Sequence, residues 1–362
     1  MKETVVVGMS GGVDSSVAAY LLKEQGYNVI GVTMQIWQDE DVCTLEHEGG
    51  CCGLSAVDDA RRVADVLEIP YYVMNFKQEF QTNVIDYFVR EYQAGRTPNP
   101  CIACNRYVKW KSLLQRSIEI GADYIATGHY ARIRQLPNGR YAIANSVTAR
   151  KDQTYALYNL TQEQLRRTLM PVGEYEKERV RQIAEEVGLP VAHKPDSMEI
   201  CFVPDGDYAS YIEQATGKPS VPGNFVDVNG HILGQHKGII HYTVGQRKGL
   251  GLALGYPAFV VQIRPETNEV VIGSLEHNLS HHVYAREMNF MGEEMFDENA
   301  VYQGKIRYNH AGAACHIVRR ADDLYECIFE EPQRGVTPGQ ALVLYRDGIV
   351  AGGGTICRPE TE

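Results

Sequence analysis

The residues Gly8-Met9-Ser10-Gly11-Gly12-Val13-Asp14-Ser15 decide how the first part of this chain is expected to fold. They follow a short β-branched run, Thr4 to Val7, and precede an apolar helical pattern that extends to about Leu22. A glycine turn between a strand and a helix brings backbone N–H groups together around an anion. Gly11 and Gly12 let a phosphate approach the main chain. The stretch therefore predicts a phosphate-binding turn, and an ordinary tight strand–helix turn is the alternative.

The composition limits the class of protein. The chain has 362 residues, enough for two or three domains, and a net charge of −11. The first apolar run is too short for a signal peptide, and no stretch approaches the length of a membrane span. Nine cysteines, an odd number without regular spacing, argue against a secreted disulfide framework. We therefore expect a cytoplasmic protein that has no membrane partner. Because the net charge is negative, any nucleic-acid binding must use local basic patches.

Strands and helices alternate through the first half of the sequence. The expected strands are 5–7, 29–34, 71–75 and 123–127, and the expected helices are 13–24, 55–67, 78–92 and 108–120. This alternation is typical of an α/β fold with a doubly wound parallel sheet. Such sheets bind ligands at the carboxyl ends of their strands, where both Gly8–Ser15 and Gly128-His129 fall.

The pattern changes after Asp205. Helical periodicity fades, and turn pairs such as Asn229-Gly230 and Asp347-Gly348 separate β-like runs. Short strands are expected at 301–308, 315–319, 325–330 and 341–345, which predicts a C-terminal antiparallel β-barrel. We expect a catalytic domain over 1–205, a small central domain over 206–275 and the barrel over 276–362.

Three cysteines are candidate reactive groups. Cys101 and Cys104 form a C-x-x-C pair that follows Thr97-Pro98-Asn99-Pro100 and precedes a helix expected from near Tyr107. A cysteine near a helix start, with basic residues following, has reason for a lowered thiol pKa. Cys201 lies about a hundred residues further on, in another polar segment. For each of them, a buried and inert thiol is the alternative.

The other cysteines form two groups. One group lies in a glycine-rich insert and consists of Cys43, Cys51 and Cys52. Zinc binding is the alternative because His47 is near, but their spacing fits no standard zinc site, so a mobile loop with incidental thiols is favoured. The second group consists of Cys315, Cys327 and Cys357. These fall in β-like runs, and we expect them in the core or the sheet.

Six segments together resemble the tRNA-specific 2-thiouridylases, a family with an ATP pyrophosphatase loop. The segments are Gly8–Ser15, Thr97–Pro100 with Cys104-Asn105, Ala126–Tyr130, Lys151–Gln153, Ile200–Phe202 and Tyr242–Gly251. No Gly-Lys-Ser/Thr follows the first segment, so the loop differs from the usual nucleoside-triphosphate loop. The resemblance covers nearly the whole chain in order. It implies an adenine nucleotide α-hydrolase-like catalytic domain, a central domain that contacts tRNA and a β-barrel.

The resemblance implies a tRNA-uridine 2-sulfurtransferase. Such an enzyme uses ATP with Mg²⁺ to adenylate the 2-oxygen of the wobble uridine, position 34, and releases pyrophosphate. Sulfur from a protein persulfide then replaces the activated oxygen, giving 2-thiouridine and AMP. The implied partners are the tRNAs for Lys, Glu and Gln and a sulfur donor such as a cysteine desulfurase or a sulfur-relay protein.

The resemblance also implies roles for individual residues. Cys201 would carry the persulfide, and Cys104 would be the partner nucleophile that forms a disulfide with it as sulfide is released. The implied ATP site comprises Gly8, Met9, Ser10, Gly11, Gly12, Val13, Asp14, Ser15, Met34 and Gly128. The implied target-base contacts are Asn99, Pro100 and Cys101. The other implied tRNA contacts are His129, Lys151, Asp152, Gln153, Arg307, Tyr308 and Gln340.

Cys101 departs from the family pattern, because many relatives carry Asp at this position. The thiol opens an alternative in which Cys101, Cys104 and Cys201 ligate a 4Fe-4S cluster with one open iron, as in related tRNA thiolases. The disulfide mechanism is the favoured hypothesis. Two other classes stay open: an ATP-dependent amidating enzyme, which needs neither Cys104 nor Cys201, and an RNA-binding barrel protein that releases no pyrophosphate.

Overall fold

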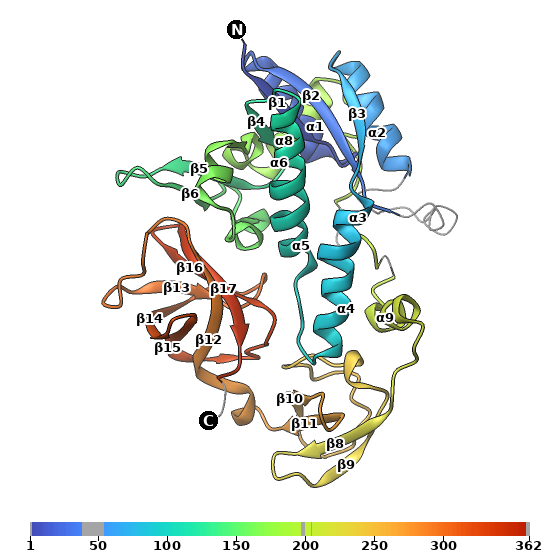
Figure 1. Ribbon diagram of the computed structural model, residues 1–362, viewed down its shortest axis with the longest axis vertical. Coiled ribbons are helices and arrows are strands. Elements are labelled where there is room, and N and C mark those ends of the chain that lie inside the picture. Colours follow the sequence, from blue (N-terminus) through green and yellow to red (C-terminus); the bar gives the residue numbers. More distant parts are fainter. Residues whose placement is uncertain (1, 38–53, 197–199, 204, 360–362) are drawn as a thin grey trace. The chain divides into compact units, whose positions relative to one another are not determined.

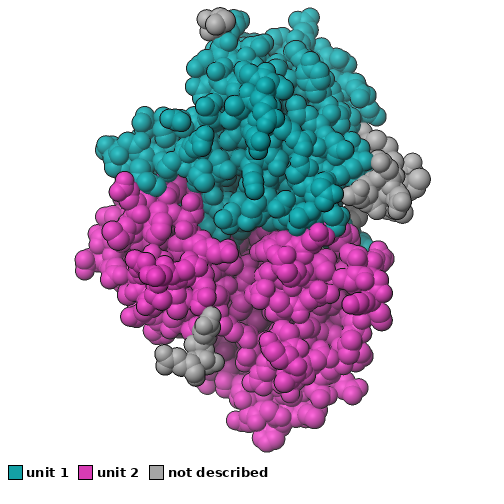
Figure 2. Space-filling model, in the orientation of Figure 1, with its two compact units in different colours: residues 1–84, 101–206, 348–350 teal, residues 85–100, 207–347, 351–362 magenta. Residues whose placement is uncertain are grey.

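The chain divides into two units whose segments are interleaved in the sequence (Figure 2). The computed structural model describes residues 2–37, 54–196, 200–203 and 205–359. The first unit consists of residues 1–84, 101–206 and 348–350, and the second consists of residues 85–100, 207–347 and 351–362. Residues 85–100 therefore belong to the second unit although they lie in the first third of the sequence.

A five-stranded parallel sheet forms the centre of the first unit (Figure 1). Its strands are β1 (Thr4–Gly8), β2 (Asn28–Gln35), β3 (Tyr71–Asn75), β4 (Tyr124–Ala126) and β7 (Thr168–Leu169). They follow the order β3-β2-β1-β4-β7, and every neighbouring pair is parallel. The strand order reverses between β1 and β4, where doubly wound sheets place their ligands. The predicted fold class of this half is confirmed.

Both faces of β1 are covered, as a central parallel strand requires. Val5, Val6 and Val7 are fully buried. The helices α1 (Val13–Glu24) and α8 (Lys177–Glu186) contribute apolar side chains to one common core with β1. A third helix, α2 (Leu54–Val66), follows β2 in the chain. These packed helices hold the carboxyl end of β1 in a fixed place.

Two long helical segments pass through a π-helical stretch; the first matches the predicted helix 78–92, and the second begins earlier than predicted. The first runs through α3 (Lys77–Phe80), a π-helical segment (Gln81–Ile85) and α4 (Asp86–Gln93). The second runs through α5 (Pro100–Ala103), a π-helical segment (Cys104–Leu113) and α6 (Leu114–Glu119). The predicted start near Tyr107 is wrong, because Pro100 begins the helix. Proline suits this first position, since its φ is already helical and its missing N–H is not needed there.

Smaller elements complete the first unit. They are β5 (Ala131–Gln135), β6 (Tyr141–Asn145), α7 (Gln162–Arg166), α8 and the 3-10 turns Ala149–Lys151, Thr154–Leu157 and Pro171–Glu174. β5 and β6 form an antiparallel hairpin, and Ala144 of β6 pairs with Ile349. This hairpin follows directly from the carboxyl end of β4 and so starts at the ligand-binding edge of the sheet.

The second unit contains a four-stranded sheet and helix α9 (Tyr208–Thr216). The strands are β8 (Gly223–Asp227), β9 (Ile232–His236), β10 (Phe259–Arg264) and β11 (Glu269–Gly273). Asp207 caps the start of α9 by accepting a hydrogen bond from Ser210 N–H, and Gly217 ends it in the left-handed conformation. Phe225, Val260 and Val270 form part of a separate apolar core for this sheet.

Six further strands close into a barrel, which confirms the predicted C-terminal fold (Figure 1). They are β12 (Leu279–Phe290), β13 (Tyr302–Lys305), β14 (Ala313–Ala321), β15 (Leu324–Arg334), β16 (Ala341–Arg346) and β17 (Ile349–Cys357). The strand order β12-β15-β14-β13-β16-β17 closes by pairing β17 with β12. Cys315, Cys327 and Phe329 lie in its buried core. Among the described residues, no helix is long and apolar enough to cross a membrane.

Candidate functional site

The loop after β1 is held in shape by its own hydroxyl groups. Ser10 N–H donates to Ser15 Oγ at 3.2 Å, and Ser15 Oγ donates to the Gly12 carbonyl at 3.2 Å. Ser16 Oγ donates to the same carbonyl at 2.8 Å. Gly12 is the N-cap of α1 and carries no side chain that would satisfy the first N–H groups of the helix. These N–H groups and the helix dipole suit an anion such as a phosphate.

The ends of β1 and β4 meet through glycine. A Cβ atom on Gly128 would lie 2.5 Å from Ser15 N and 2.6 Å from the carbonyl carbon of Asp14. Gly11 has a φ of +67°, and a Cβ there would collide with the Ala56 carbonyl oxygen. Both glycines therefore permit backbone approaches that no larger residue allows. Gly128 lies directly beside the phosphate-binding loop, as its position at a strand end predicted.

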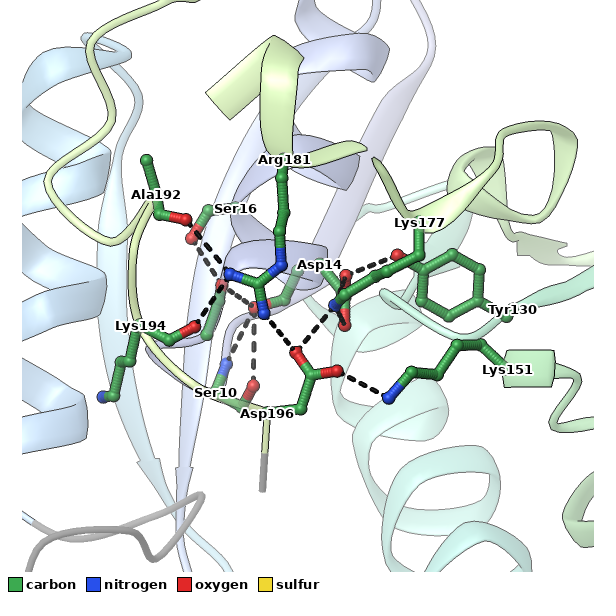
Figure 3. A network of polar contacts seen from close by, with 12 residues as sticks. Ser10, Asp14, Ser16, Tyr130, Lys151, Lys177, Arg181, Ala192, Lys194 and Asp196 are labelled. Atoms are coloured by element: carbon green, nitrogen blue, oxygen red, sulfur yellow. Dashed lines mark hydrogen bonds and ion pairs between the residues drawn. The ribbon is translucent and has the colours of Figure 1, made fainter. Parts of the chain in front are cut away.

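Lys177 joins two carboxylates beside this loop (Figure 3). Its Nζ lies 2.7 and 2.9 Å from the two carboxylate oxygens of Asp14 and 2.9 Å from Asp196 Oδ1. The lysine is only 6% exposed although it carries a charge. The Tyr130 hydroxyl donates to Asp14 Oδ1 at 2.6 Å, and Lys177 Nζ lies 5.5 Å from the centre of the Tyr130 ring. Paired carboxylates on both sides are what makes such a buried ammonium tolerable.

Asp196 receives two more cations. Lys151 Nζ lies 2.7 Å from its Oδ2, and Arg181 Nη2 lies 2.9 Å from its Oδ1. Burial raises the pKa of Asp196, but the hydrogen bonds and charges of Lys151 and Lys177 outweigh it and lower that pKa to about 2. Asp196 is therefore ionised throughout the physiological range.

The chain before Asp196 also contacts the loop. Arg181 Nη1 donates to the carbonyls of Ala192, at 3.3 Å, and Lys194, at 3.2 Å. Lys194 Nζ donates to the Gly11 carbonyl at 3.1 Å and pairs with Asp59 Oδ2 at 2.7 Å. Residues 192–196 are thus held to α8 through Arg181, as Figure 3 shows, and to the loop through Lys194.

The structure shows how the sequence-predicted cysteines are placed. Cys104 is the first residue of the π-helical segment and is half-buried, whereas Cys101 is exposed. π-helical segments occur frequently at functional sites. Cys201 is half-buried in an irregular stretch, and the neighbouring Phe202 ring packs edge-on against Phe80 with their centres 5.8 Å apart. Cys104 therefore lies inside a helix and not before the one expected from near Tyr107, because Pro100 starts the helix earlier.

The cysteines form no metal-binding group in the described structure. In the part of the chain that the structure describes, no group of three or more His, Cys, Asp or Glu side chains is placed to hold a metal. The cluster formed by Cys101, Cys104 and Cys201 stays a hypothesis. Cys43, Cys51 and Cys52 lie outside the described residues.

Several implied tRNA contacts in the first unit take part in local hydrogen bonds. Asp152 Oδ2 accepts from Ser146 N–H at 2.8 Å, and Gln153 Oε1 accepts from Tyr130 N–H at 2.9 Å. His129 Nδ1 lies 2.7 Å from Thr127 Oγ1. Burial, together with the nearby Lys109 charge, holds the pKa of His129 well below its usual value, so the imidazole is neutral near pH 7.

The implied contacts in the second unit fall into two types. Arg307 is exposed and donates to the Arg334 carbonyl at 2.9 Å, and Tyr308 is 42% exposed. Gln340 instead donates from Nε2 to the Thr97 carbonyl at 2.8 Å. Thr97 N–H in turn donates to the Pro338 carbonyl at 2.9 Å. Gln340 therefore supports the segment that leads to Asn99 and Pro100, both partly or fully buried.

Two predicted residues of the ATP site lie in strands. Gly8 ends β1, and Met34 lies near the end of β2, where it pairs in register with Met74. Sequence reasoning missed Tyr130, Lys177, Arg181 and Asp196 as members of the site. The sequence around Lys177 does not distinguish this lysine from the exposed charged residues of α8. Only the folded structure shows that it is buried.

The strand order, the anion-binding turn and the closed barrel define an α/β nucleotide-binding protein with an appended β-barrel. Three family models match the chain in sequence: "tRNA methyl transferase HUP domain" over 3–205, "tRNA methyl transferase PRC-barrel domain" over 210–274 and "Aminomethyltransferase beta-barrel domain" over 280–356.

Relatives narrow the assignment. A tRNA-specific 2-thiouridylase of Lachnoclostridium phytofermentans is 70% identical over 98% of this chain and 99% of its own length. A tRNA-specific 2-thiouridylase of Clostridioides difficile is 54% identical over 98% of both chains. A solved 4-thiouridine synthetase with RNA and ATP is 18% identical, with a TM-score of 0.33 over 59% of this chain and 50% of that one. The chain belongs to the tRNA-specific 2-thiouridylase family.

Proposed function

We propose that this protein is an ATP-dependent tRNA 2-thiouridylase that acts in the cytoplasm on the wobble uridine of tRNA. The sequence identity of 70% with a tRNA-specific 2-thiouridylase, over nearly the full length of both chains, supports the assignment. The phosphate-binding turn at the switch point of the parallel sheet supports the use of ATP. The proposed tRNA substrates are those for Lys, Glu and Gln, and the proposed sulfur source is a cysteine desulfurase or a sulfur-relay protein.

The first half-reaction is adenylation. The 2-oxygen of uridine is a poor leaving group, and attack of this oxygen on the α-phosphate of ATP turns it into a good one. Backbone N–H groups of the Gly8–Ser15 loop stabilise the departing pyrophosphate at the start of α1. Mg²⁺ prefers phosphate oxygens together with a carboxylate. Both oxygens of Asp14 already bind Lys177, and one also accepts from the Tyr130 hydroxyl, so Asp14 as placed does not fit as a Mg²⁺ ligand.

The second half-reaction transfers sulfur. The terminal sulfur of a Cys201 persulfide attacks C2 of the adenylated uridine, and AMP leaves. The Cys104 thiolate then attacks Cys201 Sγ, which releases the 2-thiouridine sulfur and forms a Cys104–Cys201 disulfide. The two thiols are oxidised by two electrons and the transferred sulfur is reduced by two, so the step balances. External thiols reduce the disulfide before the next turnover.

Binding of tRNA involves both units in this proposal. In the first unit, Lys151 pairs with Asp196, and His129 directly follows Gly128, which lies beside Ser15. In the second unit, Arg307 and Tyr308 are exposed. Asn99, Pro100 and Cys101 are proposed to contact the target base, which must leave its stack to reach the activated phosphate.

The test is to follow both products. Enzyme loaded with persulfide is mixed with substrate tRNA and α-labelled ATP. We expect AMP, pyrophosphate and 2-thiouridine in equal amounts in a single turnover. Release of ADP, or pyrophosphate release without any 2-thiouridine, contradicts the proposed function. An amidating enzyme would be revealed by full activity in both Cys104→Ser and Cys201→Ser with ammonia as nucleophile.

A further inference from the structure

We propose that Asp196 and Lys177 are positioning residues that fasten the Cys201-bearing segment to the phosphate-binding loop, so that sulfur transfer depends on their ion pair more than adenylation does. This inference rests on the proposed function. It concerns residues that neither the sequence pattern nor the resemblance assigned to the site.

The ion pair links two parts of the site that carry different steps. Asp14 belongs to the start of α1, where the pyrophosphate would leave, and Asp196 belongs to the segment that leads to Cys201. One buried ammonium, that of Lys177, is shared between the two carboxylates at 2.7 Å and 2.9 Å. Since a buried charge is costly without its partners, Lys177 holds both carboxylates in place.

Further contacts restrict the segment around Asp196. Arg181 binds Asp196 Oδ1 and also the Ala192 and Lys194 carbonyls. Lys194 Nζ reaches the Gly11 carbonyl of the loop at 3.1 Å. The segment is therefore attached to the loop both directly, through Lys194, and indirectly, through Asp196 and Lys177.

The covalent chain sets how far Cys201 can lie from this anchor. Cys201 follows Asp196 by five residues. A fully extended chain spans about 3.5 Å per residue, so the two Cα atoms are separated by at most about 18 Å. A fixed Asp196 therefore keeps Cys201 within this distance of its anchor beside the nucleotide loop. Because transfer requires near-contact of sulfur and the activated carbon, confinement raises its rate.

The contacts of Asp196 indicate that its charge matters, because three cations from two segments converge on it: Lys151, Lys177 and Arg181. Substitution by asparagine keeps the shape and removes the charge. Asp14 remains paired with Lys177 in that variant, so the loop keeps its own ion pair.

The experiment compares wild type with Asp196→Asn in single turnovers. Pyrophosphate release reports adenylation, and 2-thiouridine from persulfide-loaded enzyme reports sulfur transfer. We expect pyrophosphate release within about threefold of wild type, an unchanged KM for ATP, and 2-thiouridine formation slower by at least about tenfold. Sodium sulfide added as nucleophile bypasses Cys201, and with it the variant and wild type should form 2-thiouridine at equal rates.

Two further variants make the test decisive. Glu186→Gln removes the exposed ion pair with Arg179 on the same helix α8 and should leave both rates unchanged. Arg181→Gln removes one cation from Asp196 and both carbonyl contacts, so it should show the same split and stands in if Asp196→Asn does not fold.

Two results overturn the inference when wild type thiolates tRNA. One is an equal fall of both rates in Asp196→Asn, with no recovery on sodium sulfide, which would assign Asp196 to adenylation. The other is an unchanged rate of sulfur transfer. A wild type that makes no 2-thiouridine at all contradicts the proposed function, and the inference with it.

Discussion

Two barrel cysteines are more deeply buried than the three described cysteines of the first unit, whereas the third barrel cysteine, Cys357, is half-buried. In the barrel of the second unit, Cys315 and Cys327 are fully buried, and burial together with the neighbouring Cys315 raises the pKa of the Cys327 thiol well above its usual value. In the first unit, Cys104 and Cys201 are half-buried and Cys101 is exposed. A nucleophilic thiolate needs access and a low pKa. The comparison teaches that strand burial makes a cysteine structural, whereas a helix start or an irregular segment leaves it open to chemistry.

The largest expected difference is in thiolation. Cys201→Ser should reduce 2-thiouridine below detection while pyrophosphate release persists, because the sulfur acceptor is lost and the nucleotide loop is intact. Cys104→Ser should also stop net thiolation, since the persulfide loses its partner. Mass spectrometry of nuclease-digested tRNA measures the product, with Cys327→Ser as the matched barrel control. Full activity in both first-unit variants would break the comparison.

The second prediction contrasts two tightly enclosed glycines. Alanine at Gly128 would place Cβ 2.5 Å from Ser15 N, so the nucleotide loop must shift and pyrophosphate release should fall by at least about tenfold. Alanine at Gly304 would place Cβ 2.8 Å from Cys315 Sγ in the barrel core. This overpacking should cost about 1–3 kcal/mol in the free energy of unfolding. Urea titration measures the stability of both variants, and a pyrophosphate assay measures their activity. An equal loss of activity in the two variants would contradict this prediction.

The third prediction concerns stability alone. Cys327→Ser puts a hydroxyl into the apolar barrel core, which should lower the free energy of unfolding by about 1–3 kcal/mol. The rate of thiolation per folded molecule should stay at the wild-type value. Denaturant unfolding at pH 7 gives the first quantity. A loss of activity without a loss of stability would place Cys327 among the reactive thiols.

The fourth prediction concerns tRNA affinity. Arg307→Ala removes one exposed cation of the second unit, so tRNA binding should weaken by several-fold and the salt dependence should become shallower by about one counterion. The affinity for ATP should not change. Filter binding of tRNA at several salt concentrations measures the affinity and its salt dependence. An unchanged salt slope would exclude a phosphate contact at Arg307.

The smallest effect is expected at Cys101. Its thiol is exposed, and it is not part of a metal-binding group among the described residues. Cys101→Ser should keep thiolation within about threefold of wild type, because the disulfide mechanism uses only the thiols of Cys104 and Cys201. Anaerobic purification with iron analysis accompanies the assay. Joint loss of iron and activity would support the cluster hypothesis and extend the reactive set to three cysteines.

Much of the fold was predictable because its signals are local. The β-branched run before Gly8 and the glycines after it predict a strand, a turn and a helix, and the structure has all three. The position of Gly128 at a strand end predicted its place beside the loop, since parallel strands share one carboxyl edge. Turn pairs and short alternating runs predicted the barrel.

What could not be predicted depends on distant contacts or on competing signals. Lys177 and Asp14 are 163 residues apart, and no pattern in α8 reveals that this lysine is buried between two carboxylates. The helix that contains Cys104 was expected to begin near Tyr107, but Pro100 occupies its first position, where proline is favoured. The residue roles of Cys104 and Cys201 stay predictions.

The interleaving of the two units bears on how this chain can be divided and recombined. The first unit needs three separate stretches of sequence, and the second unit needs residues 85–100, which lie between two stretches of the first. A single cut near residue 206 would leave residues 85–100 on one fragment and Gly348–Val350, whose Ile349 pairs with β6, on the other. Fragments made that way would each lack part of a folded unit. Exchange of the barrel between homologous genes therefore calls for crossovers at several points, which makes the protein hard to reshuffle piece by piece.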